Sequence, residues 1–304
     1  MNLRFICAQP ATLYYAWQVD VMLNNFIQMG VNPKQIDIVC FNELDNTIDE
    51  WIEVVKKYPA NFFFYKDTRK TKHYISSIRP NILKQHWEVY PELKDQTVFY
   101  HDCDIVFTKP ISEWITDEMI NDSNWYGSDT KFYIGHNYIK SKGEDVLEAM
   151  CDIIGIYKEV VERNEENTIG AQYIIKNVDA KFWELVELDS EDLYKNITDL
   201  NTTKKMFDPT YHELQIWCAD MWALLWTAWK AGNTTIIHPN LTFAWGTSNI
   251  SQWDDYNIMH NAGVTSSSTG YFYKSAYTNQ YPPKDLDINK DTCSYMYYQL
   301  VKQL

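Results

Sequence analysis

The segment that most constrains the fold is the apolar run 97–107, because two aspartates interrupt it. Four residues suited to a buried strand, Thr97–Tyr100, lead into Asp102 and Asp104, and the chain becomes apolar again directly afterwards. A carboxylate beside a buried strand is unfavourable unless a partner neutralises it. In open α/β sheets, ligands lie outside the carboxyl ends of the strands, where both aspartates would lie if residues 97–101 form a parallel strand. The pattern predicts a cation site at a sheet edge, with a capped turn as the alternative.

The chain before this segment alternates between strand and helix patterns. The expected strands are 3–8, 36–41, 62–65 and 97–101, and the expected helices are 16–27, 47–58 and 80–90. Gly30 and Pro59 follow the first two helices, and Pro80 opens the third, as these residues commonly do at helix ends. Strands that alternate with helices predict an α/β fold with a parallel sheet and right-handed crossovers.

The second part of the chain is less regular. The expected elements are strands at 125–128 and 171–175, a long amphipathic helix over 146–161 and a helix over 213–231. The last helix is apolar on nearly all sides, which predicts burial, so Asp220 within it needs a partner. Residues 240–304 are rich in aromatic side chains and predict a C-terminal lobe. We expect one domain over 1–304, with a first half at 1–110 and a second half at 111–304 that includes this lobe.

The charge of the chain disfavours anionic partners. With 27 basic and 41 acidic residues among 304, the formal net charge is −14, which repels nucleic acid and anionic membranes overall. The exception is the basic segment 66–84, where Lys66, Arg69, Lys70, Lys72, Arg79 and Lys84 accompany a single acid, Asp67. This segment is either a solvated face or an anion-binding rim for a diphosphate or a phosphate backbone.

The cysteines and the N-terminus favour a cytosolic protein. Six cysteines are scattered without a Cys-x-x-Cys pair, so we expect reduced core residues and no disulfide frame or zinc site. The chain opens on a strand-like segment, and no run of about 18 apolar residues or signal peptide is visible. The expected location is the cytoplasm, or the host cytoplasm if the chain is encoded by a phage.

Two separated motifs resemble those of nucleotide-sugar glycosyltransferases with the GT-A fold. Asp102-Cys103-Asp104 resembles the Asp-x-Asp metal motif of that family. His260-Asn261-Ala262-Gly263 matches the His-x-x-Gly element that retaining enzymes of the galactosyltransferase and glycogenin type carry late in the chain. The resemblance extends over about residues 3 to 275 and includes small enzymes encoded by phages and bacteria. It implies a Rossmann-like, mostly parallel central sheet flanked by helices.

The resemblance also implies roles for individual residues. Asp102, Asp104 and His260 would hold Mn²⁺ or Mg²⁺, and imidazole as a ligand favours Mn²⁺. Asp220 and Gln172 are the candidate catalytic residues, beside the anomeric carbon of the transferred sugar. The candidate donor-binding residues are Arg79, Asp102, Gly170, Ala171, Gly263 and Lys274. Lys274 lies eleven residues after Gly263, whereas the related enzymes place their lysine about three residues after the glycine.

The implied activity is metal-dependent transfer of a sugar from a nucleoside-diphosphate sugar, with a UDP-sugar expected, to a hydroxyl acceptor. The His-x-x-Gly match favours retention, while Asp220 as a general base would allow inversion. The acceptor is left open between a glycan, a protein side chain and a hydroxymethylated pyrimidine in phage DNA. A non-catalytic sugar-nucleotide-binding module and a metal-dependent phosphohydrolase are the competing classes.

Overall fold

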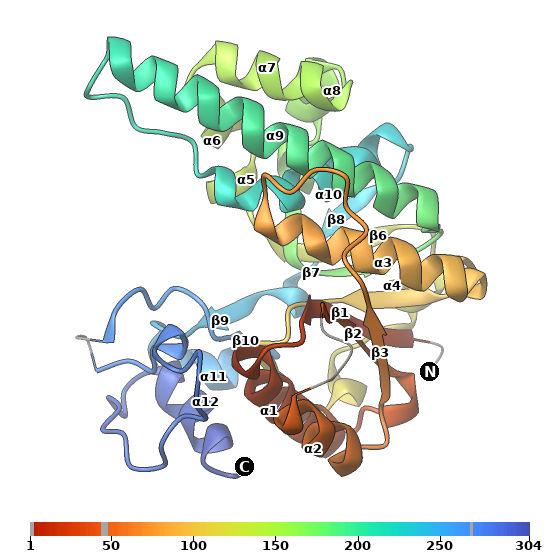
Figure 1. Cartoon of the computed structure of the whole chain (residues 1–304), viewed down its shortest axis with the longest axis vertical. Helices are drawn as coiled ribbons and strands as arrows, with labels where there is room; N and C mark the ends of the chain where they lie inside the picture. The colour runs from red at the N-terminus through yellow and green to blue at the C-terminus, as the bar shows by residue number, and fades with distance from the viewer. Residues whose placement is uncertain (1–2, 44–47, 268–269) are drawn as a thin grey trace. The chain divides into compact units, whose positions relative to one another are not determined.

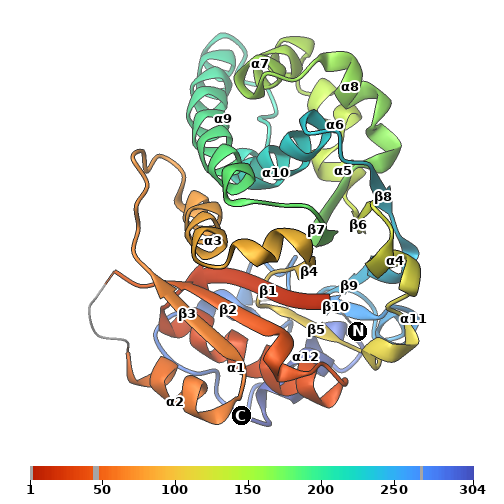
Figure 2. The ribbon, with the colours of Figure 1, turned by 90° about the vertical axis from the view of Figure 1, so that its right-hand side faces the viewer.

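The first strands of the chain form a parallel sheet, as the alternating pattern predicts. β1 (Leu3–Pro10) pairs in parallel with β2 (Ile36–Phe41), and β2 pairs in parallel with β3 (Asn61–Tyr65). The crossovers contain α1 (Leu13–Gln28) and α2 (Asp49–Lys57), which lie together beside these strands in Figure 2. β4 (Thr97–Tyr100) follows β1 in the order β3-β2-β1-β4. The α/β class is therefore confirmed.

The computed structural model describes residues 3–43, 48–267 and 270–304, which divide into two compact units (Figure 1). The first unit contains the described residues of Met1–Tyr65, Val98–Asn121 and Pro239–Leu304, and the second contains Lys66–Thr97 and Asp122–His238. Both units are therefore built from segments that lie far apart in the sequence. Residue 47, where the second expected helix was to begin, lies outside the described residues.

A second sheet in the first unit comes from elements that the sequence pattern did not predict. It has three strands in the order β5 (Ile105–Phe107), β10 (Ile258–His260) and β9 (Phe243–Trp245). α1 holds the edge strand β5 through Asn25, whose amide nitrogen donates to the Phe107 carbonyl at 2.9 Å and whose amide oxygen accepts from the Phe107 N–H at 2.7 Å. This two-way bond fixes the segment that directly follows Asp104.

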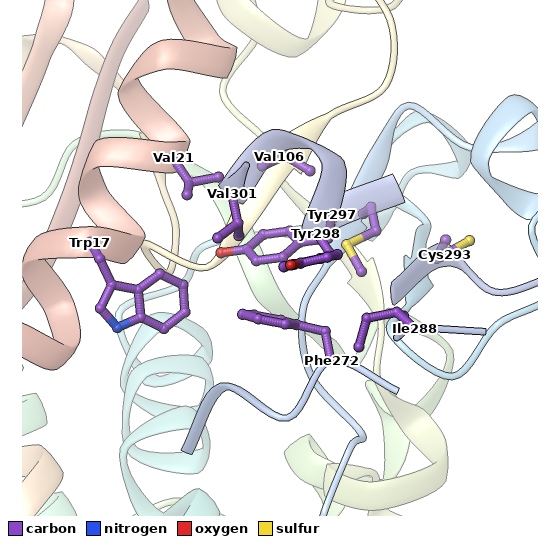
Figure 3. Packing of buried hydrophobic residues seen from close by; sticks show 11 residues of the cluster. Trp17, Val21, Val106, Phe272, Ile288, Cys293, Tyr297, Tyr298 and Val301 are labelled. Carbon is purple, nitrogen blue, oxygen red and sulfur yellow. The ribbon is translucent and has the colours of Figure 1, made fainter. Parts of the chain in front are cut away.

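The expected aromatic C-terminal lobe is present in the first unit. Short helix α11 (Gln252–Asp255) and helix α12 (Cys293–Val301) accompany the three-stranded sheet. Figure 3 shows Phe272 among Trp17 of α1 and Tyr297 and Tyr298 of α12, all of them buried. Fully buried aromatic rings contribute large apolar areas, so this cluster ties the end of the chain to α1.

The second unit combines a three-stranded arrangement with packed helices. β6 (Trp125–Asp129) lies between β7 (Ile169–Ile175), to which it is antiparallel, and β8 (Thr235–Ile237), to which it is parallel. α9 (Ala180–Phe207) packs against both α3 (Ile78–Val89) and α10 (Ala219–Lys230) (Figure 2). The second unit also contains α5 (Lys131–Ile134), α6 (His136–Lys140), α7 (Glu144–Ile154) and α8 (Lys158–Arg163), whereas α4 (Asp117–Asn121) belongs to the first unit.

Two helix predictions differ from the structure, and one long helix was not predicted. The long helix expected over 146–161 is two helices, α7 and α8, because Gly155 ends α7 in the left-handed conformation with φ of 69°. The helix expected from residue 213 begins as α10 at Ala219, after a 3₁₀ turn over Ile216–Cys218. α9 was not predicted, although Asp179 caps it by accepting from the Phe182 N–H at 2.9 Å.

All six cysteines are buried, and none is bonded to another. Within residues 3–43, 48–267 and 270–304, we find no helix with the length and apolar character needed to cross a bilayer.

Asp189 on α9 gives the second unit a predictable pH dependence. Burial raises the pKa of Asp189 to about 6, although Lys230 and the Thr227 hydroxyl act in the opposite direction. A raised aspartate pKa means that the folded state binds the proton more tightly than the unfolded state, so stability falls as the pH rises from about 4 to 6. We expect Asp189→Asn to raise the free energy of unfolding by about 1–3 kcal/mol at pH 8 and by nothing at pH 4. Urea denaturation at both pH values measures this, and an equal gain at both would contradict it.

Candidate functional site

The two sequence motifs meet because β5 and β10 are paired strands. β4 ends at Tyr100, and β5 begins at Ile105, so Asp102 and Asp104 occupy the turn between them. β10 is antiparallel to β5 in a register that places His260 opposite Ile105, the residue after Asp104. The Asn261 N–H then donates to the Asp104 carbonyl at 2.9 Å and extends this pairing by one bond. A register shift of one residue would turn the His260 side chain to the other face of the sheet.

The side chains of Asp102, Asp104 and His260 converge on one point. His260 Nε2 lies 3.2 Å from Asp104 Oδ1 and 3.7 Å from Asp102 Oδ2. One possible ligand atom from each residue lies within 4.8 Å of the others. Asp104 and His260 are only 5% and 8% exposed. The predicted triad is thus assembled in the structure, inside the first unit.

Aromatic packing orients the ring of His260. Trp245 stacks on it with the planes 11° apart and the centroids 6.3 Å apart, and Phe243 contacts it at 5.3 Å. His260 Nδ1 is buried and has no hydrogen-bond partner among the residues that the structure describes. Metal-binding histidines commonly fix their second nitrogen with a hydrogen bond. In this chain the neighbouring rings hold the imidazole so that Nε2 faces the carboxylates.

Lys274 adds a cation to the same cluster. Its ammonium group is bound to Asp104 Oδ2, although Lys274 lies far beyond the His-x-x-Gly element in the sequence. Burial raises the pKa of Asp104, but the charges of Lys274 and His260 outweigh it and hold this pKa well below its usual range. Burial likewise lowers the pKa of Lys274, and the charge of Asp104 outweighs it and raises that pKa above its usual value. Asp104 is therefore ionised over the whole physiological range.

The donor set fits a hard divalent cation. An octahedral ion with bonds of about 2.1 Å needs neighbouring ligand atoms about 3 Å apart. The separations from His260 Nε2 to the two carboxylates, 3.2 and 3.7 Å, are near this value. Two carboxylates and one imidazole also match the ligand preferences of Mn²⁺ better than those of softer ions. Three protein ligands would leave positions for oxygen atoms of another molecule.

A second polar cluster surrounds Asp220 in the second unit. Asp220 lies in the first turn of α10, is 8% exposed and forms an ion pair with Arg79 of α3. The Tyr74 hydroxyl lies 2.6 Å from both Asp220 Oδ1 and the Trp217 carbonyl oxygen. The sequence predicted that Asp220 needs a partner, and the structure supplies Arg79 and Tyr74. The role of Tyr74 was not foreseen, because no local pattern connects it with α10.

The segment 170–172 is a bulge in β7. Gly127 of β6 pairs with Tyr173, whereas the next residue, Ser128, pairs with Gly170, so Ala171 and Gln172 are the extra residues. Ala171 adopts φ of 62°, an unusual backbone conformation for a residue with a side chain. Bulges re-aim side chains and occur often beside active sites. Gln172 is fully buried in this bulge.

Two predicted donor-binding glycines have structural reasons to be glycine. A Cβ on Gly170 would lie 2.6 Å from Thr130 Cγ2 and 2.8 Å from Met221 Cε, so any other residue would force these side chains to move. Gly263 adopts φ of 84°, in the left-handed region that glycine tolerates best. These observations do not test the predicted contacts of the two glycines with a donor, which stay predictions.

The basic segment 66–84 is largely neutralised by acids of the second unit. Asp67 accepts from Arg69 and Lys72, each at 2.9 Å, and Lys84 lies 3.3 Å from Glu187. Arg79 is bound to Asp220. The segment therefore offers less free positive charge than its sequence indicates, which weakens the interpretation as an anion-binding rim.

Glu191 of α9 holds this segment in place and was missed in the sequence. It is 2% exposed, and its carboxylate accepts hydrogen bonds from the His73 N–H at 2.7 Å, the Tyr74 N–H at 3.3 Å and the Ser77 hydroxyl. This anchors the chain directly before Arg79. The available signal was weak, because Glu191 shares the buried face of an unpredicted helix with other polar residues, among them Glu187 and Ser190.

Solved structures similar to this chain are glycosyltransferases. The apo structure of the bifunctional glycosyltransferase WbbM matches with 10% identity and a TM-score of 0.45, over 87% of this chain and 46% of that protein, so the chain spans less than half of its length. The galactosyltransferase LgtC, in complex with donor and acceptor sugar analogs, matches with 12% identity and a TM-score of 0.44, over 99% of this chain and 96% of that one. A glycosyltransferase involved in glycosylation of the major capsid of PBCV-1 matches with 12% identity and a TM-score of 0.40, over 87% and 95% of the chains.

No protein family model matches the chain, and no curated protein matches it. The structural likenesses are distant, with TM-scores below 0.5. The side chains of the chain itself are therefore the basis of the functional proposal.

Proposed function

We propose that this chain is a metal-dependent glycosyltransferase of the GT-A type, which moves a sugar from a nucleoside-diphosphate sugar to a hydroxyl acceptor. The observation that carries the proposal is the convergence of Asp102, Asp104 and His260 behind the carboxyl end of β4. Two carboxylates and an imidazole at this position suit a hard cation that also binds phosphate oxygens.

The residues of the first unit have distinct proposed roles. Asp104 and His260, both buried, would hold Mn²⁺ or Mg²⁺, and Asp102, whose side chain is 35% exposed, would reach the ion and the ribose hydroxyls of the donor. The bound ion would act as a Lewis acid that stabilises the negative charge of the departing diphosphate. Lys274 carries a cation that can bind an anionic phosphate oxygen.

The residues of the second unit would act on the transferred sugar and the donor. We propose that Asp220 or Gln172 stabilises the positive charge that develops at the anomeric carbon, with retention of configuration. Gly170, Ala171 and Arg79 are the further proposed donor contacts of this unit, and Gly263 is one of the first unit. The bulge at Ala171 and the ion pair of Arg79 with Asp220 support these assignments, since both hold polar groups in defined positions.

The proposed substrates are a nucleotide sugar and a hydroxyl compound. A UDP-sugar is the proposed donor, and a glycan or a protein hydroxyl is the proposed acceptor. Hydroxymethylated DNA is the less favoured acceptor, because Arg69, Lys72 and Lys84 are paired with acids and the net charge is −14. The cytoplasm is the proposed location, and the halves 1–110 and 111–304 are the proposed division between donor and acceptor binding.

A panel of sugar nucleotides with and without Mn²⁺ tests the proposal. We expect one donor to raise the melting temperature of the purified protein only when Mn²⁺ is present, because bound ligands stabilise the folded state. The same mixture should slowly release the nucleoside diphosphate, which a coupled assay detects.

Each other class of protein has its own outcome in this experiment. Stabilisation without any release of nucleoside diphosphate would identify a binding module, and release of inorganic phosphate would identify a phosphohydrolase. If an acceptor is found, activity that falls steeply with salt would identify DNA as that acceptor.

A further inference from the structure

The carboxylate of Asp104 already has a nitrogen group on each of its oxygens. Lys274 binds Oδ2, and His260 Nε2 lies 3.2 Å from Oδ1. Asp104 is 5% exposed, so few water molecules can replace either partner. In this state the ammonium group of Lys274 supplies the positive charge that a buried carboxylate requires.

A divalent cation on the same carboxylate would lie next to this ammonium group. Like charges at such short range repel strongly in a buried site, where the effective dielectric constant is low. Metal binding to Asp104 therefore works against the Lys274–Asp104 ion pair. The lysine stem has four carbons and can move its charge without moving the backbone.

Lys274 is held near the site by its backbone as well. It begins the 3₁₀ turn Lys274–Ala276, where the Tyr277 N–H donates to the Lys274 carbonyl at 3.0 Å. Two residues earlier, Phe272 is fully buried in the aromatic core. The backbone therefore fixes where the lysine side chain begins, while its flexible stem leaves the ammonium group able to move.

We propose that Lys274 is a built-in counter-cation for Asp104, which competes with the divalent ion in the free protein and is released to a diphosphate oxygen when the donor binds. It follows that the metal and the nucleoside diphosphate bind cooperatively. The metal replaces Lys274 as the positive partner of Asp104, and the diphosphate replaces Asp104 as the negative partner of Lys274. The role of the diphosphate in this inference rests on the proposed function, whereas the competition between Lys274 and the metal does not.

Titration calorimetry with MnCl₂ tests the competition directly. We expect Lys274→Met to bind Mn²⁺ alone about 10-fold or more tightly than the unmodified protein, because the competitor has been removed. Lys274→Arg, which keeps a cation, should retain weak binding. Lys284→Met is the matched control, since Lys284 is an exposed lysine of the same unit, and its Mn²⁺ affinity should be unchanged. Unchanged or weaker Mn²⁺ binding by a folded Lys274→Met variant would overturn the proposal.

The coupling is measured with UDP as the probe, and with GDP if UDP does not bind. In the unmodified protein, saturating nucleotide should tighten Mn²⁺ binding about 5- to 150-fold, and in Lys274→Met this factor should fall towards one. If Lys274→Met does not fold, the coupling in the unmodified protein decides, and independent binding of Mn²⁺ and nucleotide would refute the inference. If no nucleotide binds at all, the proposed function fails, while the titration with Mn²⁺ alone still tests the competition.

Discussion

Replacing Asp104 with asparagine is expected to abolish Mn²⁺-dependent release of nucleoside diphosphate, with a loss of at least about 10³-fold in rate. The asparagine keeps the shape of the side chain but removes the negative charge on which His260 and Lys274 converge. Without that charge, the site loses its most buried metal ligand. The measurement is the initial rate of nucleoside diphosphate release with the donor identified in the sugar-nucleotide panel, together with calorimetric titration of Mn²⁺.

The control for this variant is Asp285→Asn, an exposed aspartate of the same unit, which should leave both rate and Mn²⁺ affinity unchanged. Far-ultraviolet circular dichroism confirms that Asp104→Asn is folded before the rates are compared. His260→Gln gives an independent test of the same site and should also lose Mn²⁺ affinity. A folded Asp104→Asn variant that releases nucleoside diphosphate at the normal rate would disprove the metal-site assignment.

Replacing Phe272 with alanine is expected to lower the free energy of unfolding by about 3–5 kcal/mol. The ring is fully buried, and its centroid lies 5.7–5.9 Å from the ring centroids of Trp17, Tyr297 and Tyr298. Truncation removes these contacts and leaves a cavity that rigid neighbouring rings cannot fill. Urea denaturation followed by tryptophan fluorescence measures the change.

Phe207→Ala is the control for this substitution, because Phe207 is 86% exposed at the end of α9 and its removal should change stability by less than about 0.5 kcal/mol. Because Phe272 lies two residues before Lys274, we also expect the Phe272 variant to hold the ammonium group of Lys274 less firmly. Equal stability of the two variants would show that the aromatic cluster does not support the lobe.

Local patterns were sufficient where an element is defined by its own residues. The strands over 36–41 and 62–65 and the helix α1 lie where their apolar periodicity places them, because hydrophobic faces must be buried whatever their neighbours are. The position of Asp102 and Asp104 after a buried strand was predictable for the same reason. α9 was missed because its apolar residues alternate with acidic ones over a long segment, and only packing against α3 and α10 makes its buried face evident.

The sequence by itself determined that the chain is an α/β protein and that two carboxylates follow a buried strand, because both features depend on neighbouring residues. Only the tertiary structure decided which distant groups meet those carboxylates. The pairing of β10 with β5 brings His260 to Asp104, and the packing of the C-terminal lobe brings Lys274 to it. Strand register and side-chain packing are long-range properties, since their free energy comes from contacts between segments that no local pattern links.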